Sequence, residues 1–194
     1  MGKIYTALGL MSGTSMDGVD ASIIKSDGER VYSALFDRYF EYGDKIRQKI
    51  LDIRAKILVP DHLIKHESEI QDIEREITLF HSNVVKEILN NNKIDLDLLG
   101  FHGQTIFHDS KKKITKQLGD GKLLSQLTKK KVVYNFRQND LKNGGQGAPL
   151  TPIFHNLIAN KYLKEKFDKS YSINFVNIGG ISNITQTAKW DELD

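Results

Sequence analysis

A polar turn between two apolar runs, at residues 12–20, holds the first group of side chains whose types fit a chemical task. Gly13 and Gly18 permit positive φ angles and let the backbone approach a ligand closely. Successive backbone N–H groups in such a turn can cradle an anion, and carboxylates can hold a cation directly or through water. The hydroxyl and carboxylate residues of the turn are Ser12, Thr14, Ser15, Asp17 and Asp20. We therefore interpret this stretch as a phosphate-binding hairpin.

Other phosphate-binding motifs do not fit this stretch. A Walker A loop requires a Gly-Lys pair followed by Ser or Thr and a helix. The turn here lacks lysine and leads into alternating apolar residues, which are typical of a strand. The three spaced glycines of a dinucleotide-binding turn are absent as well. An ordinary hairpin turn is the alternative, because Asp17-Gly18 is by itself a standard hairpin signal.

Further polar, glycine-rich loops follow expected strands, at residues 102–105, 119–121, 137–149 and 179–183. Turn chemistry alone does not require the functional side chains in these loops, which are His102, Gln104, Arg137, Asp140 and Gln146. Ligands of open α/β sheets bind at the carboxyl ends of strands, so we expect these side chains to share a site with the hairpin. Asp140 follows a strand and is a candidate general base. The alternatives are a helix N-cap for Asp140 and a surface ion pair for Arg137.

The elements that must position these residues follow from hydrophobic periodicity. Strands are expected at residues 4–11, 19–24, 31–42, 98–102, 132–136 and 171–178. Helices are expected where apolar residues recur every three or four positions, at residues 46–57, 70–88, 123–127 and 153–163. His62 and His66 have the spacing of zinc ligands, but no third ligand is apparent nearby, so we interpret both as solvent-facing. Strands that alternate with helices predict an α/β fold.

Composition excludes several classes of protein. The 194 residues carry a net charge of only +3, and 39% of them are hydrophobic, which is ordinary for a globular domain. The lysine clusters at residues 111–116 and 129–131 lack interleaved aromatic residues, so no nucleic-acid partner is expected. No apolar run reaches the length of a membrane span, so no membrane partner is expected either. The absence of cysteine fits the reducing cytoplasm.

Four separated motifs, taken in order, resemble those of the anhydro-N-acetylmuramic acid kinases. They are Met11-Ser12-Gly13-Thr14-Ser15-Met16-Asp17-Gly18-Val19-Asp20; His102-Gly103-Gln104-Thr105; Phe136-Arg137 with Asp140 and the run from Gly144 to Leu150; and the run from Asn177 to Thr185. The resemblance implies an actin-like, sugar-kinase-like fold, with two ribonuclease H-like lobes and the active site between them. It also implies that ATP, with Mg²⁺, phosphorylates 1,6-anhydro-N-acetylmuramic acid while water opens the anhydro ring. The product is N-acetylmuramic acid 6-phosphate, in peptidoglycan recycling.

The resemblance also assigns roles to residues. Asp140 is implied as the general base that activates the attacking water, and Asp17 as the carboxylate that holds magnesium. The implied sugar-orienting residues are His102, Gln104, Arg137 and Gln146. The implied nucleotide-phosphate residues are Gly13, Thr14, Ser15, Met16, Asp17, Gly18, Val19 and Asp20, with Gly179 and Gly180 in the second lobe. We expect the N-terminal turn and Asp140 to be two walls of one cleft.

Two features depart from the family pattern. Asn135 stands where the family usually has an aspartate before Phe-Arg. The family's chains are also much longer, so we expect residues 1–170 to form the first lobe and residues 171–194 a first strand and phosphate turn of an incomplete second lobe. The alternative function is accordingly a truncated or split-gene remnant, inactive alone and at most a sugar-binding lobe, which a second polypeptide would complete. Ile173, Phe175 and Val176 are then expected to be exposed or to drive association.

Overall fold

A computed structural model describes residues 2–166, 172–179 and 181–187. A six-stranded sheet organises most of these residues. Its strands are β1 (Tyr5–Ser12), β2 (Gly18–Ser26), β3 (Tyr32–Glu41), β4 (Leu98–Asp109), β5 (Ile114–Leu118) and β6 (Val132–Tyr134). The helices are α1 (Asp44–Lys56), α2 (Asp61–Lys65), α3 (Glu67–Asn91), α4 (Gly121–Thr128), α5 (Phe136–Lys142) and α6 (Pro152–Lys166). A separate two-stranded sheet contains β7 (Asn174–Asn177) and β8 (Asn183–Gln186).

The strand order of the large sheet is β3-β2-β1-β4-β5, and β6 pairs with the first half of β4. Strands β1, β2 and β3 form an antiparallel meander, whereas β4 and β6 run parallel to β1. The predicted hairpin between the first two strands is confirmed, and so is the third strand of the meander. This mixed sheet with flanking helices confirms the expected α/β lobe of the sugar-kinase type.

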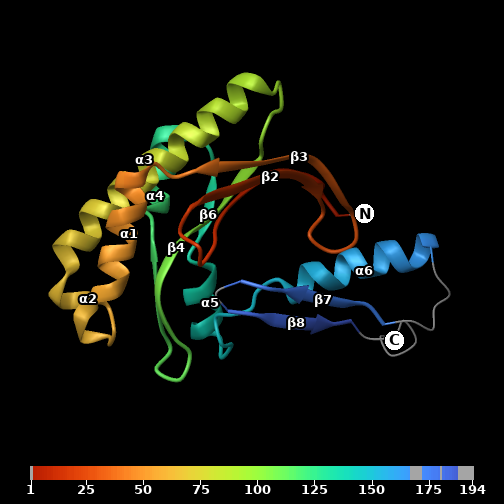
Figure 1. The fold of residues 1–194 in the computed structure, drawn as a ribbon. Coiled ribbons are helices and arrows are strands. Elements are labelled where there is room, and N and C mark those ends of the chain that lie inside the picture. Colours follow the sequence, from red (N-terminus) through yellow and green to blue (C-terminus); the bar gives the residue numbers. More distant parts are fainter. Residues whose placement is uncertain (1, 167–171, 180, 188–194) are drawn as a thin grey trace.

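The hydrophobic core lies between the sheet and the helices α1, α3 and α4. Alternate residues of β2 face it, and Val19 and Ile23 are fully buried there. The long helix α3 buries one stripe against the sheet, because its apolar residues recur at helical spacing. The buried aliphatic side chains of that stripe are Ile70, Ile73, Ile77, Val84, Val85 and Ile88. Figure 1 shows these helices gathered on one side of the sheet, with α6, β7 and β8 on the other side.

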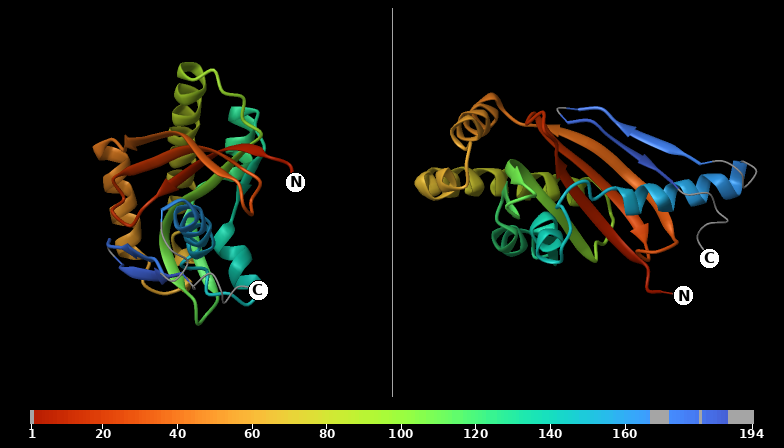
Figure 2. Two further views of the ribbon diagram at one scale, coloured as in Figure 1. Left: turned by 90° about the vertical axis from the view of Figure 1, so that its right-hand side faces the viewer. Right: turned by 90° about the horizontal axis from the view of Figure 1, so that it is seen from below.

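Helix α6 connects the large sheet to the β7–β8 hairpin. The His155 ring of α6 stacks on the Phe175 ring of β7 with centroids 4.5 Å apart, and its Nδ1 lies 2.9 Å from Thr185 Oγ1 of β8. In both views of Figure 2 the hairpin lies beside α6. The expected strand at 171–178 is confirmed within Asn174–Asn177, and residue 171 lies outside the described residues. The division at residue 170 into two domains stays a prediction.

Two expectations about loops are wrong. Residues 102–105 do not form a loop, because β4 continues through them to Asp109 with irregular register. The continuation pairs with β5, a strand that the sequence pattern did not reveal. Residues 137–142 belong to α5 instead of a loop, so the loop begins at Asn143. In both places the polar or glycine-containing sequence predicted a loop, whereas the backbone forms a strand or a helix.

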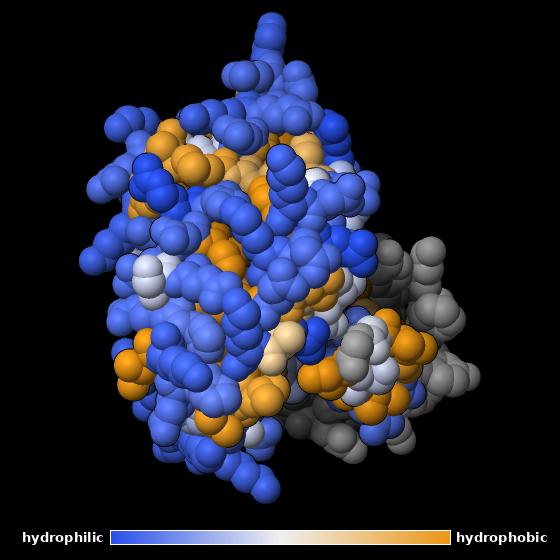
Figure 3. Space-filling view, turned by 60° about the vertical axis from the view of Figure 1, so that its left-hand side comes forward, coloured by the Kyte–Doolittle hydropathy of each residue, from blue (hydrophilic) through white to orange (hydrophobic). Residues whose placement is uncertain are grey.

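The surface over α1, α2 and α3 is mainly hydrophilic, with separate hydrophobic patches (Figure 3). Among the described residues, no helix combines the length and apolar character that a membrane crossing requires.

Candidate active site

The first and third motifs meet at one edge of the sheet. Strands β1 and β6 both run parallel to β4, with Ser12 opposite Gln104 and Tyr134 opposite Phe101. The carboxyl ends of β1 and β6 therefore lie on either side of the middle of β4. The turn after β1 and the helix α5 after β6 consequently emerge at the same edge, which is where α/β sheets bind ligands.

The turn after β1 is held by backbone contacts. Met16 N–H donates to the Gly13 carbonyl oxygen at 3.3 Å, and Tyr42 N–H donates to the Asp17 carbonyl oxygen at 2.7 Å. The positive φ expected at Gly13 and Gly18 is found instead at Met16, with φ 58° and a side chain buried in the core. Gly18 is required for a different reason, since a Cβ there would overlap the Tyr39 side chain and the Phe40 carbonyl oxygen of β3.

The hydroxyl and carboxylate side chains of the turn differ in their exposure. Thr14, Ser15 and Asp20 are exposed, whereas the Val19 side chain is fully buried, so at Val19 only the backbone can face a ligand. Ser15 Oγ donates to Asp17 Oδ1 at 2.5 Å. This hydrogen bond is the main cause that lowers the pKa of Asp17, with smaller contributions from Tyr39 and Arg47, while partial burial opposes it. Asp17 is therefore a carboxylate at neutral pH.

Gln104 fixes the turn from the neighbouring strand. Its side chain is fully buried, and its Nε2 donates to the Gly13 carbonyl oxygen at 2.9 Å. The Gln104 Oε1 atom is buried without a hydrogen-bond partner among the described residues. The amide thus positions the turn through Nε2, while its second polar atom is buried and unpaired.

His102 and Arg137 join β4 to α5. Arg137 Nε donates to His102 Nε2 at 2.7 Å, and Arg137 Nη1 donates to the Gly147 carbonyl oxygen at 2.8 Å. Because arginine has no acceptor, His102 Nε2 accepts, and the proton of the neutral ring lies on Nδ1, 2.6 Å from the Gly103 carbonyl oxygen. Burial, followed by the charge of Arg137, lowers the pKa of His102 to about 4.

Asp140 lies on α5 and holds the loop that follows the helix. Its Oδ2 accepts a hydrogen bond from Gly147 N–H at 2.7 Å, and its carbonyl oxygen accepts one from Gly145 N–H at 2.9 Å. Both alternatives from the sequence are wrong: Asp140 lies inside the helix and not at its N-cap, and Arg137 has no carboxylate partner among the described residues. Asp140 is half-buried, its carboxylate packs against Gly145, and its Oδ1 has no hydrogen-bond partner among the described residues.

Two residues near the site, Tyr42 and His108, were not predicted from the sequence, and the structure gives Asn135 a backbone role. Tyr42 bonds through its hydroxyl to Ser12 Oγ at 2.7 Å in the core, directly behind the turn. His108 lies beside Gly147, where an added Cβ would come within 2.9 Å of its Cε1. Asn135 begins α5 with φ 60°, a left-handed conformation that Asn and Asp tolerate best among residues with a Cβ. The left-handed backbone conformation therefore explains why an asparagine precedes Phe136. An asparagine near the end of the expected strand is the sequence signal that could have indicated this conformation.

The remaining predicted residues lie at the margins. Gln146 is exposed in the loop after α5. Gly179, at the turn between β7 and β8, faces the first turn, because a Cβ there would lie 3.8 Å from Thr14 Oγ1. Gly180 lies outside the described residues. The two glycine turns are therefore neighbours across the two sheets.

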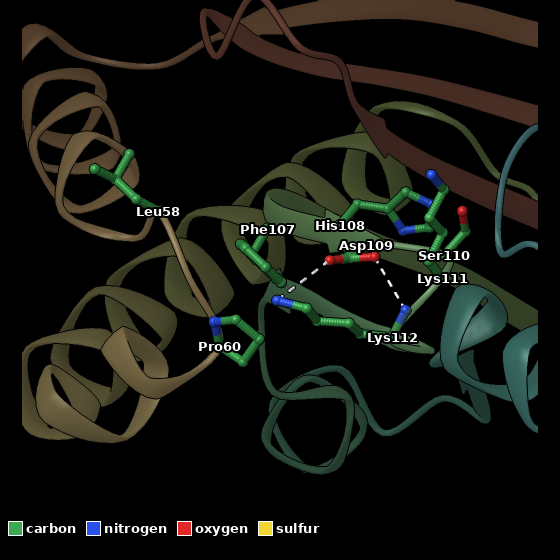
Figure 4. Close-up of a pocket in the computed structure, with 8 residues that line it drawn as sticks. All are labelled: Leu58, Pro60, Phe107, His108, Asp109, Ser110, Lys111 and Lys112. Carbon is green, nitrogen blue, oxygen red and sulfur yellow. Dashed lines mark hydrogen bonds and ion pairs between the residues drawn. The ribbon is translucent and has the colours of Figure 1, made fainter.

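A pocket of about 380 Å³ lies at the β4–β5 turn and not between the N-terminal turn and Asp140. Figure 4 shows its lining residues, which are Leu58, Pro60, Phe107, His108, Asp109, Ser110, Lys111 and Lys112. Asp109 accepts from Lys112 N–H at 3.0 Å and pairs with its Nζ at 3.9 Å.

Hydrogen bonds made by side chains of β4 join the N-terminal turn to α5. A cleft shared by that turn and Asp140 stays a prediction.

Metal ligands are sparse in the part of the chain that the structure describes. It holds no group of three or more His, Cys, Asp or Glu side chains that could bind a metal ion. His62 and His66 face each other with ring centroids 6.5 Å apart and are half-buried, not fully solvent-facing. Asp17 is the available carboxylate of the turn, and one carboxylate suits Mg²⁺ when substrate phosphates supply further ligands.

The comparisons of this chain with known proteins all point to the same family. A family model described as anhydro-N-acetylmuramic acid kinase matches residues 5–191. A protein of that name from Pelagibacter ubique is 58% identical over 185 residues, which cover 95% of this chain and 48% of the relative. Relatives of the same name from Agrobacterium fabrum and Rhizobium etli are 42% and 40% identical, each over 95% of this chain and 50% of the relative. The chain spans about half the length of the curated relatives it matches.

Proposed function

The chain belongs to the anhydro-N-acetylmuramic acid kinase family, and we propose that it binds the anhydro sugar and carries the base for its ATP-dependent conversion to N-acetylmuramic acid 6-phosphate. In that reaction the oxygen of water bonds to C1 of the sugar and the C1–O6 bridge breaks. O6 takes the γ-phosphoryl group of ATP, which leaves as ADP. The water proton goes to a base.

The observation that carries this proposal is the position of Asp140. Its carboxylate is held by Gly147 N–H through Oδ2 and lies at the edge of the sheet where β1 and β6 end. A fixed carboxylate with one oxygen that has no hydrogen-bond partner is suited to take a proton from a water molecule and to orient it. Arg137 bonds to this loop and to His102, and Gln146 belongs to the loop. These three residues are proposed to orient the sugar, with Gln104 acting through the turn.

We propose that the turn from Gly13 to Asp20 binds the phosphates of ATP. Exposed Thr14 and Ser15 hydroxyls, backbone N–H groups and the neighbouring Gly179 turn support this role. Asp17 is ionised and partly exposed, so its carboxylate fits as the protein ligand of Mg²⁺. When bound, the ion would neutralise charge on the transferred phosphoryl group.

We further propose that turnover needs a second polypeptide that covers the β7–β8 hairpin. Val176 and Ile184 stand opposite each other on one face of this hairpin, and their side chains are 61% and 66% exposed. A two-stranded sheet is marginally stable by itself, so an exposed apolar face of this kind favours a covering partner. Use of ATP, the absence of cysteine and the role in peptidoglycan recycling favour the cytoplasm as the site of action.

Calorimetric titration of the purified chain with the anhydro sugar and with ATP, separately, tests the proposal. We expect sugar binding that Asp140→Asn alters by less than Arg137→Gln, because the base acts on water while Arg137 contacts the sugar. We expect little or no phosphorylation by the chain alone in a coupled ADP assay. Failure to bind the sugar would overturn the proposed function, and rapid turnover by the chain alone would overturn the need for a second polypeptide.

A further inference from the structure

The guanidinium of Arg137 is a half-buried cation whose only bonded partners among the described residues are neutral. Its two hydrogen bonds go to His102 Nε2 and to the Gly147 carbonyl oxygen. Two other partly buried cations among the described residues pair with carboxylates: Lys116 Nζ lies 2.8 Å from Glu74 and Lys130 Nζ lies 3.0 Å from Asp95. Arg137 differs from them, because its charge is partly desolvated and has no counter-ion among the described residues.

The surroundings of Arg137 keep this charge uncompensated. His102 is neutral at physiological pH, since burial and Arg137 itself lower its pKa, and the same two causes lower the pKa of His108. Asp140 is three residues further along α5, but its Oδ2 accepts from Gly147 N–H. A guanidinium has five N–H donors, and two of them are used here. The outer edge, between Nη1 and Nη2, retains donors for a bidentate anion.

We propose that Arg137 binds the carboxylate of the sugar acid and so selects anhydro-muramic acid over anhydro sugars that lack an acid group. The proposal rests on the proposed function. N-acetylmuramic acid carries its carboxylate on a lactyl ether, and this group is ionised at neutral pH. A carboxylate fits the planar fork of arginine and supplies the missing counter-charge.

A sugar carboxylate fits this position better than a phosphate of ATP. Arg137 and Asp140 lie on one face of α5 and are tied to the same residue, Gly147, so a sugar placed against the base comes within reach of the guanidinium. The proposed phosphate turn lies across β4 from α5 and is held there by Gln104. The two ligands therefore have separate anchoring points.

The test is a calorimetric comparison of 1,6-anhydro-N-acetylmuramic acid with its neutral amide and with ATP, using the full chain. We expect the acid to bind about 10- to 100-fold more tightly than the amide, the range for a hydrogen-bonded charge pair. Arg137→Gln should abolish this preference by lowering the affinity for the acid and leaving the affinity for the amide unchanged. Arg137→Lys should retain part of it, because it keeps the charge and loses the fork.

Each other outcome contradicts the inference. Equal affinity of the unmodified chain for acid and amide would leave sugar binding intact and exclude a carboxylate site at Arg137; this comparison needs no variant to fold. If Arg137→Gln lowered the affinity for both sugars equally, the side chain would have a structural role. If it lowered the affinity for ATP alone, the guanidinium would bind a phosphate instead. Failure of both sugars to bind would overturn the proposed function together with the inference.

Discussion

Arg137 and Asp140 hold opposite ends of one residue: the guanidinium donates to the Gly147 carbonyl oxygen at 2.8 Å, and the carboxylate accepts from Gly147 N–H at 2.7 Å. The loop after α5 is thereby fastened to the helix by the two side chains proposed to bind the sugar and to activate water. Stability of the loop and geometry of the site are consequently coupled.

Asp140→Asn should separate the structural function of Asp140, which holds the loop, from its proposed function as a base. The amide retains an oxygen that accepts from Gly147 N–H, so the free energy of unfolding should fall by no more than about 1 kcal/mol. It cannot act as a base, so turnover in an assembly that supports catalysis should fall by about 10²- to 10⁴-fold. Urea unfolding and a coupled ADP assay measure the two effects. Asp140→Ala is the comparison, and it should lose stability as well. Unchanged turnover in Asp140→Asn would remove Asp140 from the mechanism.

Gly147→Ala should destabilise the chain more than Gly144→Ala. Both glycines have positive φ, 73° at Gly147 and 91° at Gly144, so alanine carries a similar backbone penalty at each position. An added Cβ at Gly147 would lie 2.9 Å from His108 Cε1 and 3.0 Å from Leu141 Cγ, whereas at Gly144 it meets open space. We expect overpacking to add about 1–3 kcal/mol at Gly147. Equal losses in urea unfolding of the two variants would contradict the close packing of this loop.

Stability should decrease as pH falls from about 6.5 toward 4. Burial is the main cause that lowers the pKa of both His81 and His102 to about 4, against 6.5 for an ordinary histidine. In this range the unfolded chain binds more protons than the folded chain, so acid favours unfolding, by up to about 3 kcal/mol for each histidine. His81→Phe, which keeps the aromatic packing against Phe101, should reduce the slope of unfolding free energy against pH. An unchanged slope would show that His81 does not contribute.

Gln104→Glu should loosen the N-terminal turn. The substitution removes the donor to the Gly13 carbonyl oxygen and sets one acceptor against another, so hydrogen exchange across residues 12–18 should accelerate. Affinity for ATP should fall, since the turn is proposed to bind its phosphates. Gln117→Glu, on the adjacent strand β5, is the control, because Gln117 bonds to Thr105 and Thr115 and not to the turn. Equal exchange in both variants would exclude the positioning function.

The β7–β8 face should drive self-association of the isolated chain. Val176 and Ile184 form an exposed cross-strand pair, so Val176→Lys should shift the mass distribution in light scattering toward the monomer. Leu58→Lys is the control, because Leu58 is 72% exposed at the α1–α2 connection, far from this hairpin. A monomer at all concentrations, with strong exchange protection across residues 174–177, would contradict the prediction.

The sequence by itself determined the hairpin of β1 and β2, the long helix α3 and the residue types of the site. Alternation and helical spacing are local properties, and each motif is contiguous in the chain. Only the tertiary structure decided that residues 102–105 continue a strand, because their pairing with β5 is non-local. It also decided the roles of Gln104 and Arg137. Their partners, Gly13 at 91 residues and His102 at 35 residues of separation, come within hydrogen-bonding distance only when β1, β4 and β6 align in parallel.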